Sequence, residues 1–140
     1  MIETAIIAHL KTAAQVTGRV GSGAEARIWL GEAHQAAEYP YIVVSMVSDV
    51  PQYGLTADQA VAEMRVQIDC VDRDARSGGD GYSGARALGD AVHDALSGWT
   101  GSQSGESFQW VAQQAGRILR DEATDVWREV QDWMIGYTAA

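Results

Sequence analysis

The sequence predicts an α+β fold, in which an antiparallel sheet of about five strands carries two helices packed on one face. Residues 62–70 alternate apolar and polar side chains, as a strand with one covered face does. Residues 2–17 and 82–96 carry apolar stripes at helical spacing. The predicted strands come in two groups, three after the first helix and two after the second, which gives the order α β β β α β β. A length of 140 residues fits one domain, 1–140.

The first half of the chain supplies one helix and two strands. The helix over 2–17 has a stripe of Ile2, Ile6, Leu10, Ala13 and Thr17. Glycines in residues 17–23 end it, and a short strand follows over Arg27–Leu30. The second strand covers Tyr39–Val47, because β-branched and aromatic residues dominate there. Pro40 lies at the first position of the strand, where a residue without a backbone N–H donor is tolerated. We expect this strand to be covered on both faces.

The alternating strand follows a protruding loop over Pro51–Asp58. Its core face carries Ala62, Met64, Val66, Ile68 and Cys70. Its other face carries Glu63, Arg65, Gln67 and Asp69, and we expect this face to be exposed to solvent or in contact with a partner. Strict alternation is uncommon in parallel strands that are covered on both faces, so the pattern favours an antiparallel sheet that is half covered.

The second half of the chain supplies, after the alternating strand, a second helix and two long strands. A glycine-rich charged loop over Asp72–Gly84 leads into the helix, whose stripe consists of Ala85, Leu88, Val92 and Leu96. Glycines and serines make Gly98–Gly105 the segment with the most flexible composition. Strands are then predicted over Phe108–Arg120 and Trp127–Tyr137, with an acidic turn between them and a bulge at Gly116.

Composition excludes several classes of function. Ten basic against nineteen acidic residues give a net charge of −9, which disfavours gripping a nucleic-acid backbone. The longest apolar runs are far shorter than a membrane span requires, and the amino terminus has no pattern of a secretion signal, so we expect no membrane partner and synthesis in the cytoplasm. Cys70, the single cysteine, is expected to be a buried core residue, and it excludes an internal disulfide.

Two motifs suggest ligands. The segment 79–84 matches G-x-G-x-x-G, but the acidic residue expected about 20 residues later falls in a loop, so a turn at the start of a helix explains it better. Asp72, Asp74 and Asp80 suggest a calcium loop, but Arg76 occupies the third ligand position. We therefore expect no cofactor and no metal.

A possible catalytic cluster lies on the second helix. Asp90, His93 and Asp94 fall within one turn and could do acid–base work or hold a metal. Arg86 stands four residues before Asp90, so a solvated helix face with an ion pair explains them more simply. Ser104 lacks the surroundings of a nucleophile elbow. We expect no catalytic residue and no enzyme, and a small enzyme using the helix cluster stays an alternative.

Aromatic and polar surface residues indicate contacts with other proteins. Tryptophan is enriched where proteins meet, and the chain has five. Trp99, beside the glycine and serine segment, is the one we expect to touch a partner. The candidate interface consists of Glu63, Arg65, Gln67, Asp69, Tyr53, Leu55 and Trp99.

The order of these patterns resembles a protein family, the tail-completion or tail-terminator proteins of long-tailed phages and of phage-derived gene transfer particles. The resemblance rests on strand and helix patterns across most of the chain. They are Arg27-Ile28-Trp29, Tyr39-Pro40-Tyr41-Ile42-Val43-Val44, Arg65-Val66-Gln67-Ile68-Asp69, Ala87-Leu88, Val92–Leu96 and Asp132-Trp133-Met134-Ile135-Gly136-Tyr137.

The resemblance implies a structural protein of the tail–head neck of a virion or phage-like particle, assembled in the bacterial host. Its partners would be copies of itself in a hexameric ring, the major tail-tube protein, and a head-side connector or stopper protein. DNA would pass through the ring without specific binding. A head-closure or adaptor protein of the neck and a monomeric binding module remain alternatives.

Overall fold

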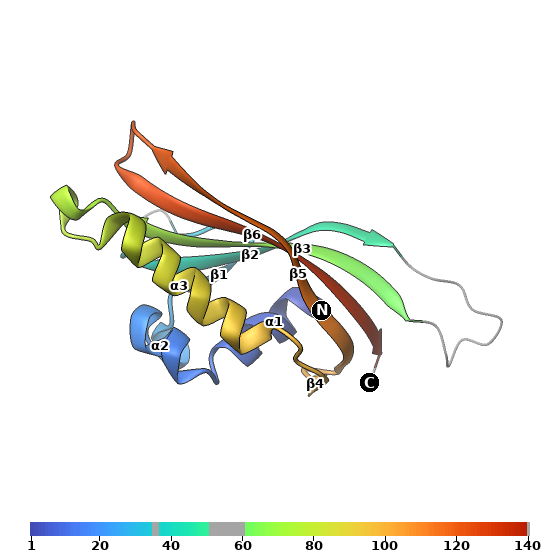
Figure 1. The fold of residues 1–140 in the computed structure, drawn as a ribbon. Helices are drawn as coiled ribbons and strands as arrows, with labels where there is room; N and C mark the ends of the chain where they lie inside the picture. The colour runs from blue at the N-terminus through green and yellow to red at the C-terminus, as the bar shows by residue number, and fades with distance from the viewer. Residues whose placement is uncertain (35–36, 51–60, 140) are drawn as a thin grey trace.

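The computed structural model describes residues 1–34, 37–50 and 61–139 (Figure 1). In these ranges six strands form one sheet with the order β1-β2-β3-β6-β5-β4. The strands are β1 (Ile28–Leu30), β2 (Tyr41–Val50), β3 (Ala62–Arg73), β4 (Gly101–Gln103), β5 (Glu106–Asp121) and β6 (Val126–Ala139). The helices are α1 (Ile2–Leu10), α2 (Ala14–Val20) and α3 (Gly81–Leu96), with short 3-10 turns η1 (Gly23–Glu25) and η3 (Ala75–Ser77). The predicted α+β class is confirmed.

The sheet differs from the prediction in strand number and in one direction. It has six strands rather than about five, because Gly101–Gln103 pairs with the start of β5. The pair β1–β2 is parallel, whereas β2–β3, β3–β6, β6–β5 and β5–β4 are antiparallel. A strand of three residues carries too little pattern to reveal its direction from sequence.

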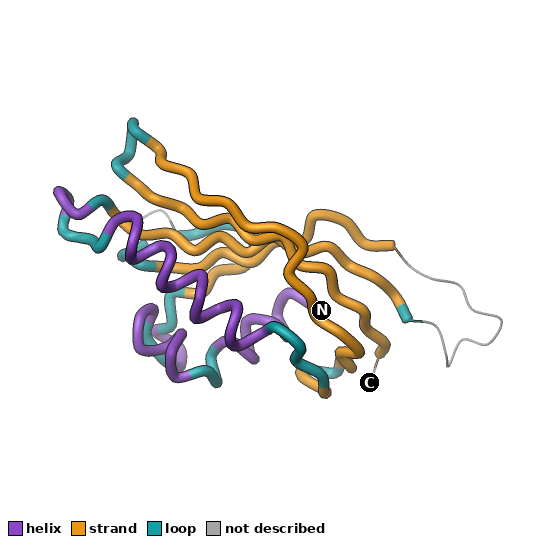
Figure 2. Tube along the Cα trace, in the orientation of Figure 1, coloured by secondary structure: helices purple, strands orange, loops and turns teal. Residues whose placement is uncertain are grey.

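The helices lie on one face of the sheet, as predicted, although the described residues contain three and not the two expected (Figures 1 and 2). Helix α3 packs on β3, β6 and β5, and α1 packs on β1 and β2. The core between these layers is mainly apolar, and its residues include Ile6, Leu10, Val66, Ile68, Leu88 and Val92, each 0% exposed. The predicted stripe of the α3 segment is confirmed, and so is the burial of Cys70.

The predicted helix over 2–17 is wrong, because the chain turns after Leu10 and starts a second helix at Ala14. The turn is closed by the Thr12 and Ala13 amides, which donate to the carbonyls of His9 and Leu10. A straight helix would have pointed Thr17 at the sheet. The turn instead buries two valines of α2 completely and delays the predicted loop until Gly21.

The prediction that β2 is covered on both faces is wrong. Ile42 and Val44 are fully buried, but Met46 and Val47 are 50% and 51% exposed. The helices cover only the first half of this strand, and a bulge between Met46 and Ser48 shifts its register. Pro40 precedes the strand rather than opening it, and its carbonyl accepts a hydrogen bond from Arg27 Nε at 2.9 Å.

Two predictions for the last third of the chain need correction. The register of β5 shifts between Phe108 and Trp110 and between Gln113 and Ala115, so the bulges are there and not at Gly116, which pairs with Gln131. The segment Gly98–Gly105 is ordered as β4 and a hairpin turn rather than an open linker. The Gly105 φ of 82° suits that turn, since glycine adopts positive φ without strain.

Candidate assembly surface

The face of the sheet away from the helices, here called the open face, brings together the predicted polar row of β3. Glu63, Arg65, Gln67 and Asp69 alternate with the buried Met64, Val66, Ile68 and Cys70, which confirms the period-two prediction. Cross-strand partners share a face. The row therefore continues into β6, where Gln67 pairs with Asp132 and Arg65 with Met134. The protruding loop predicted over Pro51–Asp58, with its contact residues Tyr53 and Leu55, lies outside the described residues.

Asp69 is the most constrained charge of this row. Its carboxylate accepts a hydrogen bond from Gln67 Nε2 at 2.9 Å, and Arg128 Nη1 lies 3.8 Å from its second oxygen. Burial raises the pKa of Asp69 above its usual value, although Gln67 and Arg128 act in the opposite direction. Arg65, by contrast, is exposed to solvent.

Replacing Asp69 by asparagine is expected to stabilise the fold at pH 7 by less than about 1 kcal/mol, because Arg128 offsets part of the cost of the buried charge. A carboxyl whose pKa is raised on folding destabilises the protein when ionised. That cost disappears as the pH falls through the raised folded pKa. The difference between Asp69→Asn and wild type in urea unfolding should therefore shrink between pH 7 and about pH 4. A difference that grew toward acid pH would contradict the burial effect.

Trp99, the tryptophan expected to touch a partner, takes part in a stack within the chain. Its ring lies 3.7 Å from the His9 ring at an interplanar angle of 13° and 4.4 Å from Phe108. The His9 Nε2 atom is in turn 2.9 Å from the Ala95 carbonyl oxygen. The stack joins α1, α3 and β5, and it leaves Trp99 partly buried against the core. Its contact with a partner stays a prediction.

A different tryptophan, Trp110, lies exposed on the open face, and the sequence reasoning missed it. With strict alternation Trp110 would share the core face with Phe108, but the bulge between them turns Trp110 to the other side. Its indole covers Gly136, where a Cβ would overlap the ring. The ring is 38% exposed. A glycine opposite a large aromatic residue was the available signal.

Asp90, His93 and Asp94, the possible catalytic cluster of the second helix, do not converge. His93 Nδ1 lies 2.6 Å from Gln113 Oε1 on β5, whereas Asp90 faces back toward Arg86, 3.9 Å away. His93 and Asp94 are exposed on the helix surface. The described residues contain no group of three His, Cys, Asp or Glu side chains arranged to hold a metal ion.

The glycines of the G-x-G-x-x-G segment position α3 against β3. A Cβ on Gly79 would overlap the Arg73 carbonyl, and one on Gly84 would overlap the Asp72 carboxylate. Asp72 accepts hydrogen bonds from the amides of Arg73 and Asp80 at 2.8 and 3.2 Å. The predicted loop over Asp72–Gly84 is thus shorter than expected, since β3 runs to Arg73 and α3 begins at Gly81.

Of the other two aspartates of the suggested calcium loop, Asp74 binds protein groups. Asp74 accepts from the Arg76 amide and lies 3.1 Å from Arg120 Nη2, and this hydrogen bonding lowers its pKa. Asp80 precedes the first residue of α3. The Asp74 carboxylate therefore stabilises the turn between β3 and α3, and the Asp80 side chain makes no capping hydrogen bond to α3.

A buried polar network between α3 and β6 was not predicted from sequence. Glu129 and Gln131 are 4% and 2% exposed. Glu129 Oε1 pairs with Arg86 Nη1 at 2.8 Å, and Gln131 Nε2 donates to Glu129 Oε2 and to the Gly89 carbonyl, each at 2.8 Å. Trp133 Nε1 donates to Gln131 Oε1 at 3.0 Å. These contacts satisfy the buried groups and fix the helix layer on the sheet.

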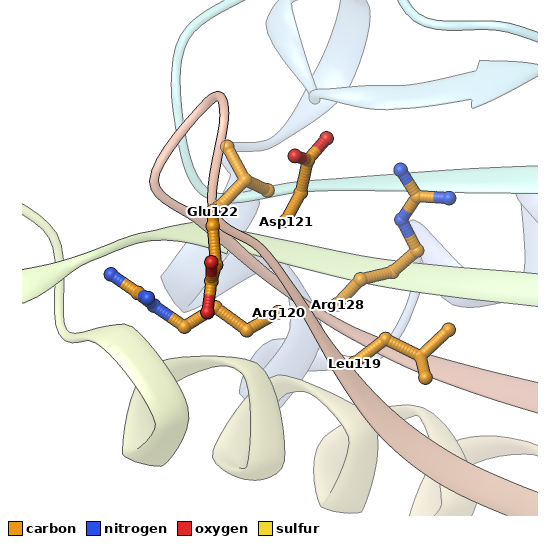
Figure 3. A pocket seen from close by; sticks show the side chains of 6 residues that line it. Leu119, Arg120, Asp121, Glu122 and Arg128 are labelled. Atoms are coloured by element: carbon orange, nitrogen blue, oxygen red, sulfur yellow. The ribbon is translucent and has the colours of Figure 1, made fainter.

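A shallow hollow of about 410 Å³ lies at the tip of the β5–β6 hairpin (Figure 3). It is lined by Leu119, Arg120, Asp121, Glu122, Val126 and Arg128. The guanidinium groups of Arg120 and Arg128 point in different directions, and Arg120 is held by Asp74 and Asp125 at 3.1 and 3.3 Å. The polar groups do not aim at one point, so the hollow is better suited to surface contact than to enclosing a small ligand.

Comparison with known proteins gives the context for this surface. Among the solved structures, one chain of "Virion of native gene transfer agent (GTA) particle" is similar in fold, with a TM-score of 0.72 and 18% identity over 97% of this chain and 93% of that chain. No curated protein sequence matches. The helices of the described residues are all too short or too polar to cross a bilayer.

The predicted resemblance is confirmed by the family comparison. Residues 4–138 match the family described as Tail completion protein gp17. The match covers α1 through β6, so it includes the helix layer and the open face alike. The chain therefore belongs to the tail completion protein gp17 family, which gives it a structural role in the tail of a phage-like particle.

Proposed function

We propose that copies of this chain close into a hexameric ring that caps the finished tail tube and joins it to the head-side connector. The observation that carries the proposal is the family match over nearly the whole chain. The mechanism is assembly: the ring occupies the end of the tube and so stops its growth. No reaction is required, and the described side chains offer shape and surface rather than a reactive pocket.

The half-covered sheet supports this function. The helices shield one face, while the open face presents Arg65 and Trp110 together with the partly covered acids Glu63 and Asp69. A mixture of aromatic and charged groups is typical of surfaces that bind proteins. We propose that the predicted interface residues of this face contact a neighbouring subunit or the tube.

The net charge of −9 also suits the proposed ring. DNA must slide through the channel of such a ring, and an acidic protein repels the phosphate backbone instead of holding it. The major tail-tube protein and the head-side connector or stopper protein are the proposed partners above and below.

Deleting the gene and imaging the particles tests the proposed function. The proposal expects tails of uncontrolled length, or tails detached from heads. Normal tails beside empty heads that have lost their DNA would instead indicate a head-closure protein. Intact particles would contradict both functions.

Reversing the charge of Arg65 is expected to reduce particle yield at least tenfold, roughly the effect of 1.4 kcal/mol on an association equilibrium. Arg65 is exposed, so the unfolding free energy of Arg65→Glu should change by no more than about 0.5 kcal/mol. Arg19→Glu is the matched control, because it makes the same charge change at an exposed position of α2. Equal particle yields for the two variants would remove the polar row from the interface.

A further inference from the structure

The two outer strands of the sheet leave most of their neighbours' edges uncovered. Strand β1 pairs with Ile42–Val44 alone, and β4 pairs with Glu106–Phe108 alone. Beyond these points the described strands give 45–50 of β2 and 115–121 of β5 no partner on the outer side. Near β4, the Gly98 amide already donates to the Val111 carbonyl of β5, so the uncovered part of β5 is the half toward its hairpin tip.

Both uncovered edges carry exposed apolar side chains. Met46 and Val47 of β2 are 50% and 51% exposed, and Leu119 of β5 is 46% exposed. Proteins usually protect an open edge with lysine, proline or a covering segment. Residues 45–50 contain no lysine, arginine or proline. The β2 edge therefore lacks these protective residues, and on the β5 edge, which does contain Arg117 and Arg120, no described strand covers residues 115–121.

We propose that copies of this chain join edge to edge, with residues 45–50 of β2 in one subunit pairing with residues 115–121 of β5 in the next. The proposal deepens the proposed ring function and rests on it, because it names the contact between ring subunits. Six or seven residues on each side make a strand pair of ordinary length. The result is a sheet that continues from one subunit to the next.

Strand direction agrees with this pairing. Each step from β2 through β3 and β6 to β5 is antiparallel, so β5 runs opposite to β2. A rotation about a ring axis preserves the direction of strands that run along that axis, and in such a ring the neighbour's β2 meets β5 in antiparallel fashion. The two edges come from different strands, so the contact is heterologous, the kind that generates a ring when the rotation between neighbours closes.

The short outer strands restrict the register. Val50 is level with Glu63, Gly136 and Trp110 across the sheet, whereas Leu119 is level with Arg128, Val71 and Tyr41. The uncovered segments thus lie at diagonally opposite corners. If two neighbouring subunits stood at the same height, β1 of one and β4 of the other would lie between the uncovered segments. Residues 45–50 and 115–121 can therefore pair only when the neighbour is shifted along the strand direction.

Charge also favours a second copy over an unrelated partner. Asp49 is the one charged residue within 45–50. On β5, Arg120 is held by Asp74 and Asp125, whereas Arg117 lies in no ion pair with a described residue. With Asp121, residues 115–121 carry a net charge of +1 against −1 for residues 45–50, so the two segments are opposite in net charge. Asp49 is level with the core residue Met64 and Arg117 with Val130 of the open face, so these two side chains lie on opposite faces of the sheet and do not pair directly.

Crosslinking of paired cysteines tests the proposal on protein taken from assembled particles. Ser48→Cys combined with Arg117→Cys, treated with a short bis-maleimide, should give a ladder of multimers in a denaturing gel. Each single variant should stay monomeric, and so should Ser48→Cys combined with Ser83→Cys, whose second site is exposed on α3. The native Cys70 is fully buried and does not compete.

The outcomes separate the edge contact from the ring. Native mass measurement of the same wild-type material should give about 90 kDa for six copies of a 15.0 kDa chain. Rings without a ladder would overturn the edge pairing and leave the ring in place. Absence of any wild-type multimer would overturn the ring, and the edge pairing with it.

Lysine substitutions give a second test that does not depend on crosslinking. Val47→Lys and Leu119→Lys should each abolish ring formation without lowering the unfolding free energy, because both side chains are about half exposed. Tyr82→Lys, at a residue of α3 that is 53% exposed, should leave rings intact. Normal rings in both edge variants would overturn the proposal.

Discussion

Trp133→Ala is expected to lower the free energy of unfolding by about 3–5 kcal/mol, the usual cost of removing a buried tryptophan. Trp133 is 0% exposed and pairs with Val66 at the centre of the sheet. Its removal leaves a cavity under α3 and an unpaired oxygen on Gln131, since the indole N–H donates there. Urea unfolding at pH 7 measures the loss, which is a large part of the stability of a domain of this size.

Two further tryptophan variants separate the contribution of the Trp133 hydrogen bond from that of its buried ring. Trp133→Phe keeps most of the ring volume and loses the hydrogen bond, so it should cost about 1–3 kcal/mol. Trp110→Ala should cost less than Trp133→Ala, because the Trp110 ring lies on the surface of the open face and 38% of it is exposed. Equal losses for Trp110→Ala and Trp133→Ala would contradict the assignment of the core to the helix side of the sheet.

Gly89→Ala is expected to destabilise the protein by about 2–3 kcal/mol, although alanine favours helix. A Cβ at this position would overlap the Glu129 carboxylate and come within 3.1 Å of Gln131 Nε2. Glu129 cannot move away cheaply, because it is buried and held by Arg86 and Gln131. Thermal or urea unfolding of the variant measures the effect.

Gly18→Ala is the matched control for this substitution. Gly18 lies in α2, and no atom lies within 4 Å of the position of its added Cβ. The same chemical change should therefore stabilise the protein by up to about 1 kcal/mol. If Gly89→Ala were also stabilising, the close contact between α3 and the buried network would be wrong.

The strands and helices with strong local patterns were predictable from sequence. The alternation over 62–70 identified both faces of β3, and the stripe of Leu88, Val92 and Leu96 identified the buried side of α3. Each signal lies within one element and repeats at the period of that element.

Features that depend on tertiary contacts were not predictable in this way. The break between α1 and α2 rotates Val16 into the core, which a single helical stripe cannot show. The bulge after Phe108 moves Trp110 to the open face, because one extra residue reverses the alternation. The burial of Glu129 depends on Arg86, a residue 43 positions earlier.

Residues of the candidate interface were likewise predictable where a local sequence pattern marks them, and not where their exposure depends on tertiary contacts. The β3 row was found because its residues alternate, and the structure places them on one face. The exposed edge residues Met46 and Leu119 were missed, since exposure at an edge depends on how far the neighbouring strand extends.

Electron cryomicroscopy of the assembled particle tests the proposed function most directly. The expected result is density with six-fold symmetry between the end of the tail tube and the head-side connector, into which six copies of this fold can be placed. Particles in which that position is occupied by another protein, or in which this chain lies elsewhere, would contradict it.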